Sequence, residues 1–132
     1  MRRSFVGLLA VVLGLTLVAA SCGSDDESAT KAAFIYVGPV GDAGWTYAHD
    51  QGRLAAAAET GVETAFVEAV PEGTADFGNY VRDFIDQGFN VIIGTSFGYM
   101  DDMEALAGEF PDVVFDHVSG YKANGTNFGN TF

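Results

Sequence analysis

Basic side chains are scarce in this chain: six lysines and arginines stand against 18 aspartates and glutamates, for a formal net charge of −12. Arg2 and Arg3 precede a leading apolar run, so residues 22–132 hold four basic and 18 acidic residues, a charge of −14. This excess of negative charge argues against nucleic acid and anionic lipid as partners. It does not by itself indicate a cationic ligand, because solvated helix faces can carry most of these acids.

Cysteine and histidine are almost absent. Cys22 is the single cysteine, so a disulfide within the chain is excluded. His49 and His117 are the only histidines, and neither belongs to an HxxxH or HxxE pattern of the kind that holds a metal ion. The sequence therefore predicts neither a metal site nor a bound cofactor.

The motifs of several enzyme classes are missing as well. The glycines of residues 38–44 form no GxGxxG, and no Lys-Ser or Lys-Thr pair follows them, which excludes a dinucleotide fingerprint and a P-loop. No serine stands in a GxSxG elbow. The adjacent acids Asp101 and Asp102 fit a solvated helix start better than a catalytic pair. The sequence predicts a protein that is not an enzyme.

The amino-terminal segment has the organisation of an export signal. Arg2 and Arg3 form a basic start, and residues 5–20 are an uncharged apolar run. This run has about 16 residues, fewer than the roughly 20 that span a bilayer as a helix. We therefore predict that residues 1–21 are a signal peptide and that the mature protein lies outside the cytoplasm.

Small residues, Ala19-Ala20-Ser21, stand directly before Cys22 and resemble a bacterial lipobox, in which the cysteine is acylated after the signal is cut off. Acyl chains contribute about 0.8 kcal/mol per buried CH2, enough for a stable anchor when two or three are present. Residues 22–31 begin with a polar stretch and predict a flexible tether. The expected location is the cell membrane, lipid-anchored on its extracytoplasmic face; the alternative is a plain signal peptide cut near Ser21.

Two hydrophobic periods alternate along residues 32–132. Short apolar runs typical of buried strands are joined by segments with helical spacing, which predicts a βαβαβαβ order and a three-layer α/β domain with a parallel sheet. The run at residues 90–94 is wholly apolar after its first residue, as in a strand buried on both faces. The expected strands are 32–37, 62–70, 90–94 and 113–115, and the expected helices are 44–60, one that Thr74 caps and Gly88 ends, and 100–110. Residues 127–132 could begin a further element, and we expect the chain to be a fragment of a longer protein.

Ligands of open parallel sheets bind beyond the carboxyl ends of the strands, so the loops at 38–45, 95–98 and 117–121 are the candidate site. Asp42 is either a hydrogen-bond acceptor for a ligand or a helix cap. Trp45 either stacks on a flat ring or fills the core. The remaining candidate ligand-binding residues are Tyr47, Ser96, Phe97 and Gly98, with packing beneath the loop as the alternative for Phe97.

Several motifs resemble the basic membrane protein (PnrA-like) family, whose members are lipoproteins that bind solutes, often purine nucleosides or purines, for ABC importers. The most specific is FIYVGPVGDAGW at residues 34–45, with AHDQGR at 48–53 behind it. Others are GTSFGYM at 94–100, FPDVVF at 110–115 and HVSGYK at 117–122. The resemblance extends from Ala32 to Phe132.

The resemblance implies a periplasmic-binding-protein-like (type I) fold of two α/β lobes around a hinge, with residues 32–132 as a truncated amino-terminal lobe. It implies that Asp42 and Trp45 contact the base or sugar of a purine-type ligand and that the loop 96–98 lines the same cleft. Its expected partners are ABC permease subunits. Some family members have Asp-x-Ser-Phe-Asn in the first loop, so the identity of the purine stays open. The alternative function is an exported ligand-sensing domain with the same fold.

Overall fold

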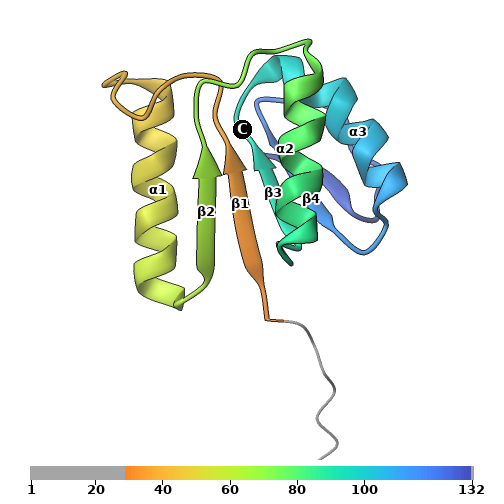
Figure 1. The fold of residues 1–132 in the computed structure, drawn as a ribbon, viewed down its shortest axis with the longest axis horizontal. Helices are drawn as coiled ribbons and strands as arrows, with labels where there is room; N and C mark the ends of the chain where they lie inside the picture. Colours follow the sequence, from red (N-terminus) through yellow and green to blue (C-terminus); the bar gives the residue numbers. More distant parts are fainter. Residues whose placement is uncertain (1–28, 132) are drawn as a thin grey trace, which may run out of the picture.

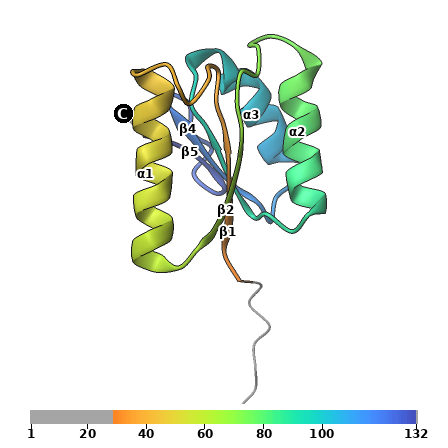
Figure 2. The same ribbon diagram turned by 60° about the vertical axis from the view of Figure 1, so that its left-hand side comes forward.

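The computed structural model describes residues 29–131, which form one five-stranded sheet with helices on both sides (Figures 1 and 2). All strand pairs are parallel, in the order β2-β1-β3-β4-β5. The elements are β1 (Lys31–Ile35), α1 (Trp45–Thr60), β2 (Glu63–Val67), α2 (Ala75–Asp86), β3 (Val91–Gly94), the 3-10 turn η1 (Phe97–Tyr99), α3 (Met100–Glu109), β4 (Val114–Val118) and β5 (Phe128–Thr131).

The three layers are plain in Figure 2, where α1 lies on one side of the sheet and α2 and α3 lie on the other. The predicted parallel α/β architecture is confirmed. The expected export signal, the expected lipidation site Cys22 and most of the predicted tether lie outside the described residues. None of the helices in the described part of the chain is long and apolar enough to cross a membrane.

Helix α2 follows from its sequence pattern. Phe77, Val81 and Phe84 recur at helical spacing and are buried, and Asp76 lies in the first turn, where the helix dipole favours negative charge. Thr74 occupies the N-cap position, but its hydroxyl donates a hydrogen bond to the Pro71 carbonyl at 3.1 Å and caps no helical amide. The expectation of a Thr74 side-chain cap is therefore wrong.

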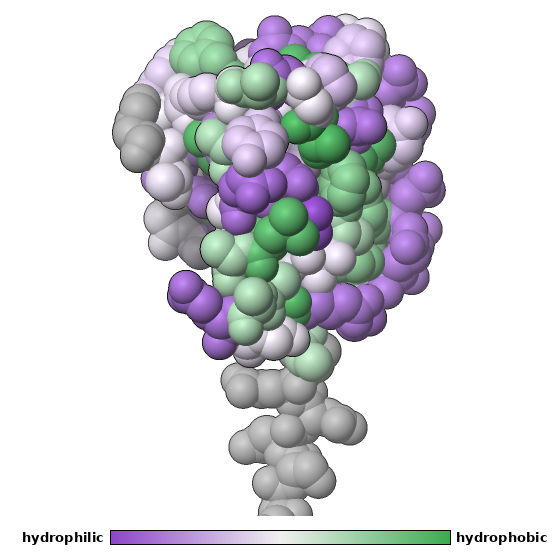
Figure 3. All heavy atoms as spheres, turned by 90° about the vertical axis from the view of Figure 1, so that its left-hand side faces the viewer, coloured by the Kyte–Doolittle hydropathy of each residue, from purple (hydrophilic) through white to green (hydrophobic). Residues whose placement is uncertain are grey.

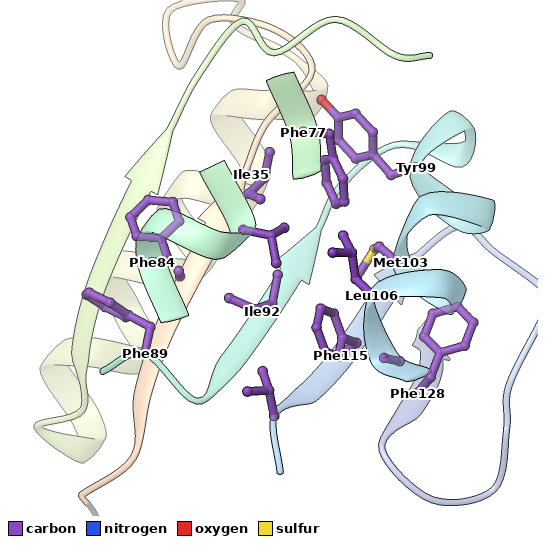
Figure 4. Close-up of a cluster of buried hydrophobic side chains, with 14 of the residues drawn as sticks. Ile35, Phe77, Phe84, Phe89, Ile92, Tyr99, Met103, Leu106, Phe115 and Phe128 are labelled. Atoms are coloured by element: carbon purple, nitrogen blue, oxygen red, sulfur yellow. The ribbon is translucent and has the colours of Figure 1, made fainter. Parts of the chain in front are cut away.

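Strand alternation gives the sheet two unlike faces. Successive side chains of a strand point to opposite sides, and one set packs under α2 and α3 as the core shown in Figure 4. β1, β3 and β4 send fully buried side chains to this core: Ala33 and Ile35 from β1, Ile92 from β3 and Phe115 from β4.

The opposite face is only partly covered. Val91 and Ile93 are half-buried, and Val114 is 50 % exposed, so the prediction of a β3 strand buried on both faces is wrong. The physical reason is the position of α1, which packs chiefly against the edge strand β2 and leaves the central strands open on that side.

Two boundaries near the carboxyl end differ from the prediction. β4 extends to Val118, so His117, expected in a loop, is a buried strand residue. The polar, glycine-containing segment Phe128–Thr131 forms a fifth strand, which pairs with β4. In addition, the predicted loop 95–98 continues into the 3-10 turn η1.

Candidate functional site

The carboxyl ends of β1 and β3 lie side by side where the chain changes direction. From β1 the chain crosses through α1 to β2 on one side, and from β2 it returns through α2 to β3 on the other side. Ile35 at the end of β1 is level with Gly94 at the end of β3. Such a switch point is where open parallel sheets bind ligands. The loops that begin at residues 36 and 95 meet there.

Trp45 joins these two loops. Its indole N–H donates a hydrogen bond of 2.6 Å to the carbonyl of Thr95, which directly follows β3. The His49 ring packs against the indole with centroids 4.5 Å apart, and His49 Nδ1 lies 2.7 Å from the Trp45 carbonyl. The Trp45 side chain remains 46 % exposed. The indole is therefore held in one orientation at the carboxyl ends of the strands and does not fill the core.

Asp42 holds the start of α1. Its Oδ1 accepts hydrogen bonds from the amides of Gly44 (2.8 Å) and Tyr47 (3.0 Å), and its Oδ2 accepts one from the amide of Thr46 (2.9 Å). These amides, that of Tyr47 first, lower the pKa of Asp42 from 3.8 to about 2. The structure thus shows the capping contact, and a ligand contact by Asp42 stays a prediction.

This geometry predicts a pH dependence. Because the folded-state pKa of Asp42 is depressed, its stabilisation is present above pH 3.8 and is lost as the pH falls toward 2. The variant Asp42→Asn keeps a side-chain acceptor without the charge. We expect urea unfolding between pH 4 and 2 to show a shallower loss of stability in Asp42→Asn than in the wild type. Equal slopes in the two proteins would contradict this role of the carboxylate.

Glu72 is a site residue that the sequence analysis missed. It lies in the loop after β2, and its Oε1 accepts hydrogen bonds from the Ser96 hydroxyl and from the Gly98 amide (2.9 Å). These donors lower the pKa of Glu72. A Cβ on Gly98 would lie 2.4 Å from the Glu72 Cδ, so the loop 96–98 fits around this carboxyl group. No motif links Glu72 to a residue 24 positions away, and Pro71-Glu72-Gly73 indicated only a turn.

Other exposed aromatic rings accompany Trp45 in the candidate site. Phe97 is 57 % exposed, and its ring lies 6.3 Å from that of Tyr121, which is 68 % exposed. Phe97 therefore does not pack beneath its loop. Tyr47, in the first turn of α1, is also about half exposed. Tyr121 lies in the predicted candidate loop 117–121 but was not named among the candidate ligand-binding residues.

Buried polar groups support the loop from below. His117 is fully buried, and its Nε2 lies 2.6 Å from the Ser96 carbonyl, so this nitrogen carries a proton. His117 Nδ1 and the hydroxyl of buried Thr46 have no hydrogen-bond partner among residues 29–131. A Cβ on Gly120 would lie 1.7 Å from His117 Nδ1, so glycine is required there. His117 thus fixes the backbone from which Phe97 projects.

The arrangement is suited to binding. It presents aromatic faces, a carboxylate and backbone groups at one edge of a rigid sheet, as expected for the orientation of a small molecule. Within residues 29–131, no three carboxylate, imidazole or thiol groups gather into a cluster that could hold a metal ion.

Comparisons with known proteins identify the family of this chain. Residues 29–132 match the model of a family described as ABC transporter substrate-binding protein, PnrA-like. A purine-binding protein of Brucella abortus is 45% identical over 117 residues, 87% of this chain and 32% of that protein. A putative ABC transporter glucose-binding protein of Haloferax volcanii is 39% identical over 103 residues, 76% of this chain and 25% of that protein.

A solved ABC transporter solute-binding protein from Conexibacter woesei superposes with a TM-score of 0.64 at 21% identity, over 77% of this chain and 34% of that chain, and so shares its fold. The chain spans between a quarter and a third of the length of the curated relatives it matches. The family match covers all of the described residues and confirms the resemblance seen in the sequence. The chain belongs to the PnrA-like family of ABC transporter substrate-binding proteins.

Proposed function

We propose that this protein is the extracytoplasmic solute-binding component of an ABC importer and that it binds a purine nucleoside or purine base. The observation that carries the proposal is the half-exposed Trp45 ring, held at the switch point of the sheet by its hydrogen bond to Thr95. The family match supports a small-molecule ligand, permease subunits as partners and a role in transport in place of catalysis.

The purine class is favoured over a sugar by two observations. The relative with 45% identity is named a purine-binding protein, whereas the relative named a putative glucose-binding protein is 39% identical over a shorter segment. In addition, Trp45 and Phe97 present flat rings on neighbouring loops, and every nucleobase has a π-face that stacks on such rings.

A thermal-shift panel on the complete protein encoded by the gene tests this proposal. The panel compares adenine, adenosine, guanosine and inosine with glucose and amino acids. A ligand that binds only the folded state raises apparent stability by RT ln(1 + [L]/Kd), so the binding class is read directly from the shifts. We expect a shift with purine compounds only. A shift with glucose and with no purine would overturn the purine proposal.

Trp45→Ala is expected to weaken binding of the purine by about 1–3 kcal/mol, as is typical of base–aromatic stacking. Trp45→Phe retains a ring without the N–H and should lose less affinity. Leu54→Ala is the matched control, because Leu54 is exposed to the same 46 % on the same helix but lies away from the edge. Calorimetry of the folded variants gives the affinities. Equal affinity for wild type and Trp45→Ala would exclude stacking on this indole.

Membrane anchoring through Cys22, which lies outside the described residues, is part of the same proposal. The wild-type protein should partition into detergent and carry the added mass of its acyl chains, because each buried CH2 contributes about 0.8 kcal/mol. Cys22→Ser should abolish both properties. Intact-mass spectrometry and detergent phase separation provide the measurement, and an unchanged mass and partition in Cys22→Ser would refute lipidation at this residue.

A further inference from the structure

The connection between β2 and α2, residues 68–74, is anchored beside the loop that follows β1. The amide of Ala69 donates a hydrogen bond to the carbonyl of Gly38 at 3.2 Å. The amide of Val70 donates one to the carbonyl of Tyr36 at 3.0 Å. Ala69 has a φ of 56°, in the left-handed region that residues with a Cβ rarely adopt, so the surrounding contacts fix its backbone.

Two glutamates of this connection each bind one loop of the candidate site. Glu68 Oε2 accepts a hydrogen bond of 2.7 Å from the amide of Val40, in the loop after β1. Glu72 Oε1 accepts hydrogen bonds from the Ser96 hydroxyl and from the Gly98 amide, both in the loop after β3. Figure 3 views the side that carries α1 and β2, and hydrophilic and hydrophobic residues are mixed there at the upper end, where the strands terminate. Both glutamates are exposed, so polar contacts at the surface join the two loops.

Gly98 shows how closely the second loop fits around Glu72. A Cβ on Gly98 would lie 2.4 Å from the Glu72 Cδ and 2.7 Å from each of its carboxylate oxygens. The φ of Gly98 is not positive, so residues with a Cβ could adopt its backbone conformation. Glycine is therefore needed there because of the space that the carboxylate occupies.

Phe97 lies between two residues that Glu72 holds. Ser96 is buried, its hydroxyl is bound to Glu72, and its carbonyl faces His117 Nε2 at 2.6 Å. On the other side, the Gly98 amide is bound to the same carboxylate oxygen of Glu72. The ring of Phe97 itself is more than half exposed, so its direction is set chiefly by this backbone.

We propose that Glu72 is a positioning residue for ligand binding: its carboxylate fixes the loop 96–98 so that the Phe97 ring is held ready to stack on the ligand. This inference rests on the proposed purine function and adds a residue that acts through Phe97. The Ser96 hydroxyl and then the Gly98 amide lower the pKa of Glu72, so its carboxylate is ionised at neutral pH and accepts charge-assisted hydrogen bonds.

A double-mutant cycle of Glu72→Ala and Phe97→Ala in the complete protein tests the proposal. Calorimetry with adenine, adenosine, guanosine and inosine gives the affinities. Glu72→Ala should weaken purine binding about tenfold, within the range of coupling between residues of one network. In the Phe97→Ala background the same change should weaken it less than about threefold, because the ring that Glu72 positions is gone. Additive losses would overturn the proposal, since Glu72 would then act independently of Phe97.

Three further variants sharpen the test. Glu72→Gln keeps a side-chain oxygen that can accept both hydrogen bonds, so it should lose less affinity than Glu72→Ala. Glu63→Ala is the matched control, because Glu63 is an exposed carboxylate paired with Lys31 at the other end of the sheet, and it should bind as the wild type does. Gly98→Ala should weaken binding in the wild type but add little to Glu72→Ala, which leaves room for the Cβ. An equal effect of Gly98→Ala in both backgrounds would contradict the fit around Glu72.

Amide exchange in the unliganded protein separates a failure of this inference from a failure of the proposed function. The Tyr99 amide donates to the Ser96 carbonyl at 3.1 Å, so it reports the loop without being bound to Glu72. Its exchange should be about tenfold faster in Glu72→Ala, because local opening becomes easier. Faster exchange in a protein that binds none of the purines would overturn the purine function and retain the hold of Glu72 on the loop. Unchanged exchange would overturn the positioning role, whichever compounds bind.

Discussion

Arg53→Ala is expected to lower the free energy of unfolding by about 3–5 kcal/mol, because it leaves a buried carboxylate without its cation. Arg53 Nη2 and Nε each lie 2.8 Å from Asp50 Oδ1, and the two side chains are only 10% and 12% exposed. The guanidinium also donates to the Thr64 hydroxyl at 3.0 Å and lies over the Phe66 ring, with its central carbon 4.7 Å from the ring centroid.

Loss of Arg53 leaves the Asp50 carboxylate with the hydroxyl of buried Tyr36 at 3.3 Å, a single neutral donor. Burial, and then the negative charge of Asp50, raise the pKa of Tyr36, so this hydroxyl remains protonated and can donate. One neutral hydrogen bond does not offset the desolvation of a carboxylate.

Chemical unfolding of the full chain measures the effect. Lys31→Ala is the control, since the Lys31–Glu63 pair is more exposed, at 31% and 58%, and should contribute about 1 kcal/mol or less. The double variant Asp50→Asn/Arg53→Met removes both charges and should recover much of the loss. Equal destabilisation by Arg53→Ala and Lys31→Ala would show that the Asp50–Arg53 pair behaves as a surface pair.

Phe77→Ala should destabilise the fold by about 3–5 kcal/mol and also loosen the site. Phe77 is fully buried, and its ring is stacked on Tyr99 with centroids 4.3 Å apart (Figure 4). The Tyr99 hydroxyl donates a hydrogen bond of 2.5 Å to the carbonyl of Val70, in the loop that carries Glu72. The cavity left by Phe77→Ala therefore lies beneath the loop that carries Glu72 and the loop that leads into Tyr99.

Two readouts separate stability from loop order. Chemical unfolding gives the free energy, and amide exchange at Gly98, whose N–H is bound to Glu72, reports the loop. Tyr80→Ala on the same helix is the control, because Tyr80 is 40 % exposed and should be nearly neutral. If Phe77→Ala is destabilised but amide exchange at Gly98 is unchanged, then the packing of Phe77 does not order the loop of the candidate site.

The parts of the fold that the sequence predicted are those with a local signal. The helical spacing of Phe77, Val81 and Phe84 is a complete pattern within one segment, and it located α2 and its buried face. The short apolar runs located β1 and β3 for the same reason. Because a short apolar run does not reveal whether one face or both are covered, the half-open side of β3 was not predicted.

The sequence predicted which loops form the candidate site, but not the hydrogen bonds that connect them. The order of the strands placed Trp45 and Phe97 at one edge, as observed. The roles of Glu72 and His117 depend on contacts across 24 and 21 residues, for which the sequence contains no pattern. Asp42 had two local interpretations, and the structure shows its carboxylate accepting hydrogen bonds from the amides at the start of α1.

Trp45 is also the single tryptophan of this chain, so its indole is a native fluorophore within the candidate site. Its N–H is held by a backbone carbonyl and its ring is half exposed, so its emission depends on the position of the loop after β3 and on whatever covers the ring. The movement of that loop and the arrival of a molecule beside the Trp45 ring can thus be followed by fluorescence without an attached dye, and Phe77→Ala provides a means of altering the signal.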